Sequence, residues 1–350
     1  MVKIKRIFFI FILTTMLSYT IAQDLNQLSK RVDIPWDNYV EWWYFNGVLL
    51  LEDQQQSLSF PFIFLVAHEQ RFLSIDEPPR QVLFTLFINF SASKPYSLTD
   101  YYTFSEESDN INNYLNSSID NFFYLMPNKN TKINKENNTF FIDFKSNNGN
   151  EILQLQVTPI NGEPKTYCNK SFQINSNIPL RAYNYPIIKY KGTIAINKNK
   201  YNVISGIGFF DYNAWAVGWT KSIKEWLWLS MYSNDIQMTL WAFNTTGFKN
   251  YDFRVINVFD PKTNLIKNYC NEKISINFKE VENPDLATLT IETNDLEAKI
   301  ETILNRQYLL VRPEYTDDIH FVETKIKYNG KTNYGFSFIE FLDSLMFLQD

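Results

Sequence analysis

Histidine and cysteine are scarce in this chain, whose 350 residues contain only His68, His320, Cys168 and Cys270. No Cys-x-x-Cys or His-Glu-x-x-His sequence occurs, so the ligand spacing of common zinc sites is missing. The sequence also has no Gly-x-Ser-x-Gly turn for a nucleophilic serine and no glycine-rich phosphate loop. We therefore expect neither a metal nor a cofactor, and we interpret His68, beside Glu69, as a surface residue at a strand end.

Long apolar runs are confined to the amino-terminal end. Residues 1–22 have the parts of a secretory signal peptide: a basic start, an apolar stretch from Ile7 to Leu17, and small residues before a cut at Gln23. The apolar stretch is shorter than the roughly 20 residues that cross a bilayer. No later stretch reaches that length without charges. We expect a secreted protein with no membrane span after signal cleavage.

Two further features agree with the secretory route. Asn-x-Ser/Thr sequons for glycosylation begin at Asn89, Asn116, Asn137, Asn169 and Asn244. An asparagine-rich chain also produces sequons by chance, so the sequence leaves open which of them carry glycans. Cys168 and Cys270 either pair, as an oxidising compartment permits, or remain two buried thiols. A disulfide would add roughly 4 kcal/mol of stability through loop-closure entropy.

Basic residues are scattered rather than clustered, and the formal net charge is only −5. The sequence therefore lacks the positive patch that attracts nucleic acid, and we expect no nucleic-acid partner. Aromatic residues are abundant instead, at 17% of the chain. Because aromatic side chains suit the half-buried, pleated surface of a sheet, this composition indicates a folded, β-rich protein.

Sustained helical periodicity is scarce, and alternation with a period of two takes its place. Apolar residues recur at every second position in 58–64, 140–144, 153–157 and 236–242, which predicts short strands separated by turns. The length of the chain suggests two domains. Halves of about 150 residues with many short strands fit two small antiparallel barrels. We place the domains at 23–180 and 181–350, with the boundary where the patterning pauses.

Tryptophan is concentrated in residues 204–243, downstream of the acid Asp211. This stretch contains five of the eight tryptophans: Trp215, Trp219, Trp226, Trp228 and Trp241. The rings either fill the core of a barrel or line a pocket for an apolar molecule. A second aromatic segment surrounds Glu41, and a strand there sends Glu41 and Trp43 to one face and Trp42 and Tyr44 to the other.

An acid beside aromatic rings matches the needs of alkene hydration. The acid protonates carbon, the rings stabilise the cation, and a held water completes the addition. A carboxyl stays protonated near neutral pH when an apolar pocket desolvates it. Asp211 is the candidate acid, and Glu41 or Glu340 is the candidate second carboxyl. The alternative is a structural role, in which these carboxyls accept hydrogen bonds from an indole or the backbone.

Three segments resemble the lipocalin-like AttH and carotenoid 1,2-hydratase (hydroxyneurosporene synthase) family. They are Glu41 to Gly47, Gly192 to Trp228 and Gly335 to Glu340, and they span nearly the whole mature chain in the family's order. The resemblance implies an all-β fold of two lipocalin-like antiparallel β-barrels packed side by side. It also implies a protein that binds or transforms apolar molecules, since the family contains carotenoid and prenylated-flavonoid hydratases, fungal cyclases and lipid-handling proteins.

The sequence departs from that family at two positions. The hydratases tend to show Asp-His-x-Trp, whereas this chain has Tyr212 after Asp211 and one more residue before Trp215. They also carry a Tyr-x-Asp that falls near residues 241–243, where this chain has no carboxylate.

The leading hypothesis is a secreted two-barrel protein that binds a small hydrophobic molecule, such as an isoprenoid, polyketide or lipid. The alternatives are a cofactor-independent hydratase or cyclase with Asp211 as general acid, and a structural surface or attachment protein without a ligand. The expected catalytic residues are Asp211 and Glu41. The expected ligand-binding residues are Trp43, Tyr212, Trp215, Trp219, Trp226, Trp228 and Glu340.

Overall fold

The computed structural model describes residues 39–344 with gaps. The gaps are at 53–56, 72–79, 93, 105–109, 161–162, 167–171, 174–178, 217–222, 234, 245–250, 252, 271–274, 281–285, 293–296 and 312–314. The expected signal peptide at residues 1–22 lies outside the described part and stays a prediction. Within the described ranges, no helix is long and apolar enough to cross a membrane.

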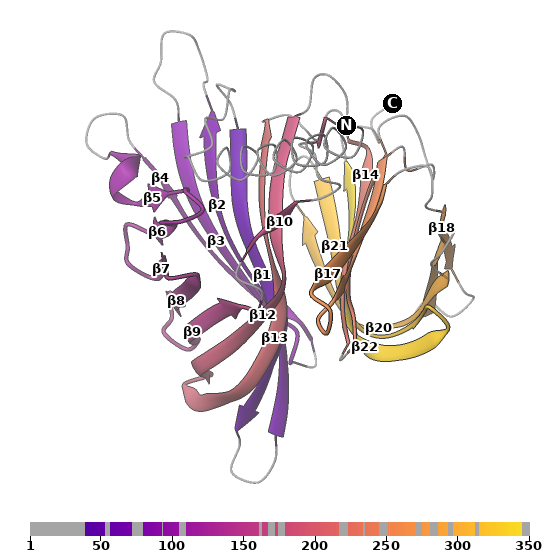
Figure 1. Cartoon of the computed structure of the whole chain (residues 1–350). Coiled ribbons are helices and arrows are strands. Elements are labelled where there is room, and N and C mark those ends of the chain that lie inside the picture. The colour runs from indigo at the N-terminus through magenta and orange to yellow at the C-terminus, as the bar shows by residue number, and fades with distance from the viewer. Residues whose placement is uncertain are drawn as a thin grey trace, which may run out of the picture.

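The chain folds almost entirely into antiparallel strands, which form two sheets (Figure 1). The strands of the first sheet are β1 (Tyr39–Glu52), β2 (Ser57–Arg71), β3 (Arg80–Asn89), β4 (Tyr96–Thr103), β5 (Leu115–Asn116), β6 (Phe123–Leu125), β7 (Thr131–Glu136), β8 (Thr139–Lys145), β9 (Ile152–Pro159), β10 (Lys165–Thr166), β11 (Phe172–Gln173), β12 (Pro179–Ile196) and β13 (Asn199–Ala216). Their order is β4-β3-β2-β1-β13-β12-β9-β8-β7-β6-β5, and β10 and β11 also pair with β12. A 3-10 turn, η1, spans Ile111–Asn113.

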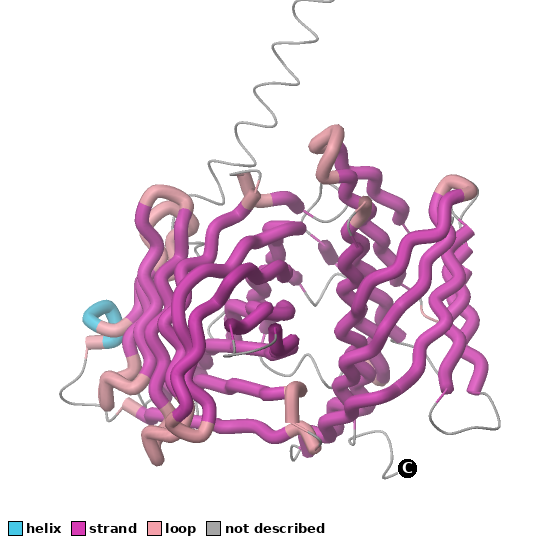
Figure 2. The backbone as a smooth tube through the Cα atoms, turned by 90° about the horizontal axis from the view of Figure 1, so that it is seen from below, coloured by secondary structure: helices cyan, strands magenta, loops and turns pink. Residues whose placement is uncertain are grey.

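The second sheet contains the remaining strands, in the order β17-β16-β15-β14-β22-β21-β20-β19-β18. These are β14 (Glu225–Ser233), β15 (Gln237–Asn244), β16 (Phe253–Asp260), β17 (Leu265–Cys270), β18 (Ser275–Glu280), β19 (Leu286–Glu292), β20 (Glu297–Val311), β21 (Tyr315–Tyr328) and β22 (Lys331–Ser344). The two sheets curve separately and lie side by side (Figure 2). The expected fold class of two lipocalin-like barrels is confirmed.

The expected boundary at residue 180 is wrong, because it would assign β12 and β13 to the second barrel. Both strands belong to the first sheet, where β13 pairs with β1 from Tyr39↔Ala216 to Glu52↔Asn202. The chain passes to the second sheet between Ala216 and Glu225. The pause near residue 180 marks the approach to β12, and local patterning does not reveal that a late strand pairs with the first one.

Aromatic side chains fill the first barrel. The two edges of the first sheet meet where the hydroxyl of Tyr124 in β6 donates a hydrogen bond to the carbonyl oxygen of Phe84 in β3 at 2.8 Å. The largest fully buried side chains facing its interior are Trp43, Tyr124, Tyr185, Tyr190, Tyr212, Phe45, Phe60, Phe62 and Phe64. The interior of this barrel is therefore a packed core.

Gly208 permits the close packing at the centre of the β1–β13 pair. A Cβ atom on Gly208 would lie 1.9 Å from the carbonyl oxygen of Asn46 and 2.7 Å from the ring of Tyr190. The Tyr190 hydroxyl donates to that same carbonyl oxygen at 2.9 Å. The glycine that resembles the family's motif is thus required by packing against the barrel wall.

A second core lies between the two sheets. We call it the inter-sheet core, and its buried members are Tyr44, Ile63, Leu86, Ile88, Phe90, Phe209, Trp215, Ile223, Trp226, Trp228, Tyr232, Trp241, Phe243, Val255, Ile319, Phe338 and Leu342. A third cluster covers the other face of the second sheet and includes Leu227, Leu229 and Met231. Because side chains alternate along a strand, β1, β13 and β14 each contribute to two cores.

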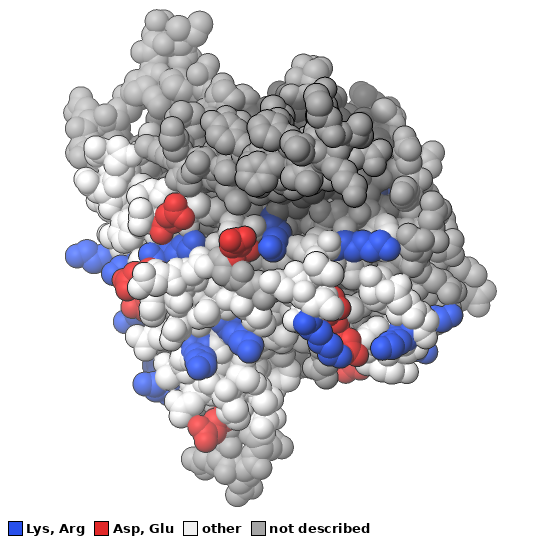
Figure 3. Space-filling model, viewed as in Figure 1, with Lys and Arg blue, Asp and Glu red and all other residues white. Residues whose placement is uncertain are grey.

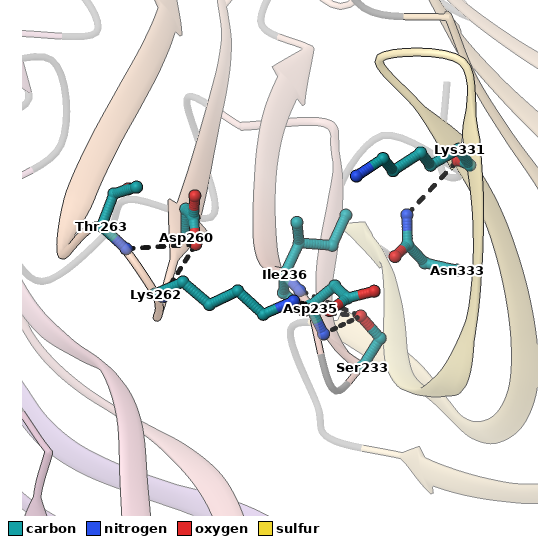
Figure 4. A network of polar contacts seen from close by, with 8 residues as sticks. All are labelled: Ser233, Asp235, Ile236, Asp260, Lys262, Thr263, Lys331 and Asn333. Atoms are coloured by element: carbon teal, nitrogen blue, oxygen red, sulfur yellow. Dashed lines mark hydrogen bonds and ion pairs between the residues drawn. The ribbon is translucent and has the colours of Figure 1, made fainter.

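The face of the molecule drawn in Figure 3 carries charged residues of both signs. Lysine and arginine are spread singly over the face in Figure 3 rather than gathered into a patch. In the second sheet, Lys262 pairs with Asp235 and so ties the β16–β17 turn to the β14–β15 turn (Figure 4). Both side chains are more than half exposed, at 70% and 51%, so this ion pair contributes little stability.

The structure bears on the expected glycosylation sites and on the two cysteines. Asn89 and Asn244 end β3 and β15 and are buried, so a glycan does not fit on either in the folded chain. Asn116 and Asn137 are exposed, and Asn169 lies outside the described residues. Cys270 at the end of β17 is disulfide-bonded. The only other cysteine of the sequence, Cys168, lies outside the described residues.

Candidate functional site

Alternation along β13 divides the predicted site residues into two groups. Asp211 and Trp215 face the second sheet, whereas Tyr212 faces the interior of the first barrel. The residues between the sheets are Asp211, Trp215, Trp226, Trp228 and Glu340, and those inside the first barrel are Glu41, Trp43 and Tyr212. Trp219 lies outside the described residues. The structure therefore contains two polar clusters, on opposite faces of one sheet.

The inter-sheet core is layered along facing strands. In the first layer, the ring of Trp42 stacks on Trp215 at 6.0 Å, Trp215 stacks on Trp241 at 6.4 Å, and Trp226 lies 6.4 Å from Trp42. In the next layer, the ring of Tyr44 meets Trp228 edge to face at 5.1 Å. The tryptophan excess of the sequence is thus concentrated where β1 and β13 face β14 and β15.

Hydrogen bonds join the two sheets one layer further on. The buried Asn46 donates its Nδ2 to Ser230 Oγ at 3.3 Å and accepts the Tyr232 hydroxyl on its Oδ1 at 2.6 Å. Asn46 belongs to β1, and both partners belong to β14. This contact fixes the separation of the strands that carry Tyr44 and Trp228. No signal in the sequence marks this contact, since a single asparagine in an apolar strand matches no motif.

Asp211 is the centre of a row of three polar side chains on the inter-sheet face. It is the direct cross-strand partner of Tyr44 on β1 and of Asn184 on β12. Asp211 is 2% exposed and Asn184 1%. Asn213 follows two residues along β13 and lies on the same face, with no exposed surface. An acid is thus held between a phenol and two amides and is buried from bulk solvent.

The facing sheet supplies two more acids. Glu340 on β22 is the direct partner of Trp228 on β14, and Asp317 on the neighbouring β21 is buried. Asp211, Glu340 and Asp317 all lie close enough to Tyr44 for their negative charges to raise the pKa of its hydroxyl, after the larger effect of burial. The sequence pattern did not single out Asp317.

Burial shifts the proton affinity of these acids. It raises the pKa of the Asp211 carboxyl well above its ordinary value, and the negative charge of Glu340 adds to this rise against an opposing effect of Asn213. Glu340 keeps part of its surface accessible, yet burial of its carboxyl raises its pKa to about 7, with hydrogen bonding to Asp317 opposing. Burial therefore favours the protonated form of the Asp211 carboxyl, and the Glu340 carboxyl titrates near neutral pH.

Several buried polar atoms in this region have no hydrogen-bond partner. They are Tyr44 Oη, Asn184 Nδ2, Asp211 Oδ1, both Asn213 side-chain polar atoms and Trp228 Nε1. Asn46 and Asn213 influence the pKa values of Tyr44 and Asp211, but no hydrogen bond of normal geometry joins either pair. Folded proteins leave only a few per cent of buried polar groups unpaired. These unpaired atoms surround Asp211 between the two sheets.

The second cluster lies inside the first barrel, and its Glu41, His68 and Tyr212 side chains are hydrogen-bonded to one another or to Gln81. Glu41, 2% exposed, accepts the Tyr212 hydroxyl at 3.0 Å and pairs with His68 Nδ1 at 3.1 Å. His68 Nε2 contacts Gln81 Oε1 at 3.3 Å. The expectation that His68 is a surface residue is wrong, because β2 extends to Arg71 and turns His68 into the barrel, where it is 1% exposed.

No metal site emerges from these clusters. Within the described ranges, no three histidine, cysteine, aspartate or glutamate side chains are arranged to hold a metal ion.

Comparison with solved structures identifies the fold. An AttH candidate protein from Nitrosomonas europaea superposes with a TM-score of 0.62 at 11% identity, covering 87% of this chain and 92% of that chain. This chain has the AttH-like fold. Kievitone hydratase from Nectria haematococca superposes at 0.55 with 10% identity, covering 87% of this chain and 88% of that one. CghA superposes at 0.58 with 9% identity, covering 88% of each chain, and a CghA structure with Sch210972 gives 0.54 at 8%.

The AttH-like resemblance is confirmed at the level of fold. No protein-family model and no curated protein matches the sequence. At identities of 8–11%, the shared architecture does not transfer a reaction or a substrate. Function therefore has to be argued from the site itself.

The raised pKa of Glu340 predicts that the protein loses stability as pH rises. A carboxyl with a raised pKa in the folded state binds its proton more tightly when the chain is folded. Its contribution to stability is therefore fully present below pH 4.5, the ordinary pKa, and is lost as the pH rises through about 7, the folded-state pKa. We expect the unfolding free energy to fall by up to roughly 1.4 kcal/mol per pH unit in this window. Glu340→Gln should flatten the profile measured by chemical denaturation. An unchanged profile in the variant would exclude Glu340 as its source.

The paired cluster predicts a structural role for Glu41. Glu41→Ala leaves His68 and the Tyr212 hydroxyl without their buried acceptor, so we expect a loss of about 3 to 5 kcal/mol in unfolding free energy. Glu41→Gln keeps one acceptor oxygen and should cost less. Denaturant melts of both variants test this order. Wild-type stability in Glu41→Ala would show that the cluster does not support the barrel.

Proposed function

We propose that this chain is a cofactor-independent enzyme that adds water to a carbon–carbon double bond of an apolar small molecule held between its two sheets. The observation that carries the proposal is the position of Asp211, which is buried beside the aromatic inter-sheet core and close to a second acid, Glu340, with the pKa of both carboxyls raised by desolvation. A carboxyl kept neutral by desolvation is the usual means of obtaining an acid at neutral pH.

The reaction proceeds through protonation of the alkene, attack of water, and return of the surplus proton to Asp211. The Asp211 carboxyl gives its proton to the less substituted alkene carbon, and a carbocation forms on the other carbon. The rings of Tyr44 and Trp228 stabilise that charge, an interaction worth about 2 kcal/mol when desolvated. Water attacks the cation, and its surplus proton passes to the Glu340 carboxylate and back to Asp211. Alkene and water are consumed, an alcohol is formed, and both acids are regenerated.

Alternation along the strand explains why the departure from the family at Tyr212 does not oppose this proposal. Tyr212 faces the first barrel, where its hydroxyl donates to Glu41, so it contributes nothing to the inter-sheet face. Phe243 is one ring of the tryptophan layer, 5.6 Å from Trp215. The acids that the proposal uses are Asp211 and Glu340, which come from different sheets.

The comparisons support this proposal over ligand binding alone. One solved neighbour is a hydratase by name, and another was solved with a small organic molecule, Sch210972. The inter-sheet region is the candidate for substrate because it brings Asp211 and Glu340 together among aromatic rings. We also propose that the protein acts outside the cell, on the support of the signal-peptide pattern in residues 1–22.

The test is turnover of an isoprenoid-bearing phenol. Kievitone and simpler prenylated phenols would be incubated with the purified chain in water enriched in heavy oxygen, and products analysed by mass spectrometry for the addition of one labelled water. We expect Asp211→Asn to lower the rate by about 100-fold or more, in line with the contribution of general acids. Asp235→Asn, an exposed acid on the second sheet, should leave the rate unchanged.

Two outcomes would contradict the proposal. Equal turnover in Asp211→Asn would remove Asp211 from the mechanism. No water addition by the wild-type chain with any member of the panel would exclude hydration of prenylated phenols and would favour a protein that only binds such molecules.

A further inference from the structure

The inter-sheet site contains more hydrogen-bonding groups than proton transfer requires. Asp211 and Glu340 suffice for the two proton steps, yet unpaired polar atoms also remain on Asn184, Asn213 and Trp228. An amide Nδ2 and an indole Nε1 are donors only, and the amide oxygen of Asn213 is an acceptor. The unpaired atoms are thus mainly donors, which require acceptor atoms from a ligand.

These donors converge beside the acid. Asn184 is the direct partner of Asp211 across the β12–β13 pair, and Asn213 is the diagonal neighbour of Asn184 on the same face. Diagonal neighbours lie about 7–8 Å apart at their Cα atoms, within reach of amide side chains. Trp228 approaches from the facing sheet, with its ring 5.1 Å from that of Tyr44. One acceptor oxygen placed over Asp211 can therefore receive more than one of these donors.

The acids around the site disfavour an anionic ligand. A carboxylate or phosphate would have to lie beside three acids, Asp211, Glu340 and Asp317, and any negative charge on them would repel it. A pure hydrocarbon would bury the amides of Asn184 and Asn213 without partners. Each unsatisfied buried donor weakens binding by about tenfold or more relative to a paired one.

We propose that Asn184 and Asn213 bind a carbonyl oxygen of the substrate, so that the site selects neutral, unsaturated carbonyl compounds over the corresponding hydrocarbons. The inference rests on the proposed function for the location of the site and extends it to a class of substrate. A carbonyl oxygen has two lone pairs and can accept both amides at once. This contact holds the alkene beside the carboxyl of Asp211, and the aromatic layers receive the rest of the molecule.

The test compares two ligands that differ only in the carbonyl group. β-Ionone, an isoprenoid ketone, and its analogue with a methylene in place of the carbonyl would be titrated into the full chain, with tryptophan fluorescence as the readout. We expect the wild type to bind the ketone at least tenfold more tightly. Asn184→Leu and Asn213→Leu should each reduce this preference, mainly by lowering the affinity for the ketone. Asn202→Leu, an exposed position of the same strand β13, should preserve it.

The outcomes separate this inference from the proposed reaction. Asp211→Asn should keep the preference for the ketone even though turnover is lost, because the carbonyl contact does not use that acid. A preference that is unchanged in both Asn184→Leu and Asn213→Leu, or a wild type that binds both ligands equally or neither, would overturn the inference. Loss of turnover in Asp211→Asn would still stand in that case. Asn184→Ser serves as a second variant if the leucine at this position prevents folding.

Discussion

The structure depends on one pair of strands that is buried on both faces. β1 and β13 pair along their whole length and form the wall between the first barrel and the inter-sheet core. Since successive side chains point to opposite faces, each residue of this pair has its surroundings decided by whether its position is odd or even. Glu41 and Tyr212 share the barrel with His68, while Tyr44 and Asp211 face the second sheet. A slip of one residue would exchange the two clusters.

The two clusters show how the effect of burial on a carboxyl depends on whether its oxygens have hydrogen-bond partners. Inside the barrel, Glu41 has two partners and the network is satisfied, which suits a structural role. Between the sheets, Asp211 retains an unpaired oxygen, and its pKa is raised by desolvation. Unpaired buried groups cost stability, and such costs are concentrated at functional sites. The chain offsets this cost with the surrounding aromatic layers and the Asn46 contact between sheets.

Local patterns predicted much of this architecture. Period-two alternation indicated the strands and correctly placed Glu41 and Trp43 on one face of β1 with Trp42 and Tyr44 on the other. The motif residues indicated the AttH-like fold. Asp211, Trp228 and Glu340 were named from sequence and lie in one region, because the tryptophan excess reflects a real interface.

The remaining features depend on pairings between distant residues. Nothing local shows that β13 pairs with β1, so the boundary was placed at residue 180 and Glu41 was considered as a partner of Asp211. His68 was assigned to the surface because the length of β2 is set by its neighbours in the sheet. Asn184, Asn213 and Asp317 acquire their importance only when three strands and two sheets are brought together, and no spacing in the sequence marks them.

The protonation state of Asp211 tests the central claim most directly. Infrared difference spectroscopy between the wild type and Asp211→Asn at neutral pH would detect the carbonyl stretch of a protonated buried carboxyl. The account predicts that this band is present in the wild type and absent from the variant. A difference spectrum that shows only the bands of an ionised carboxylate would contradict it, because an ionised Asp211 has no proton to give to a substrate.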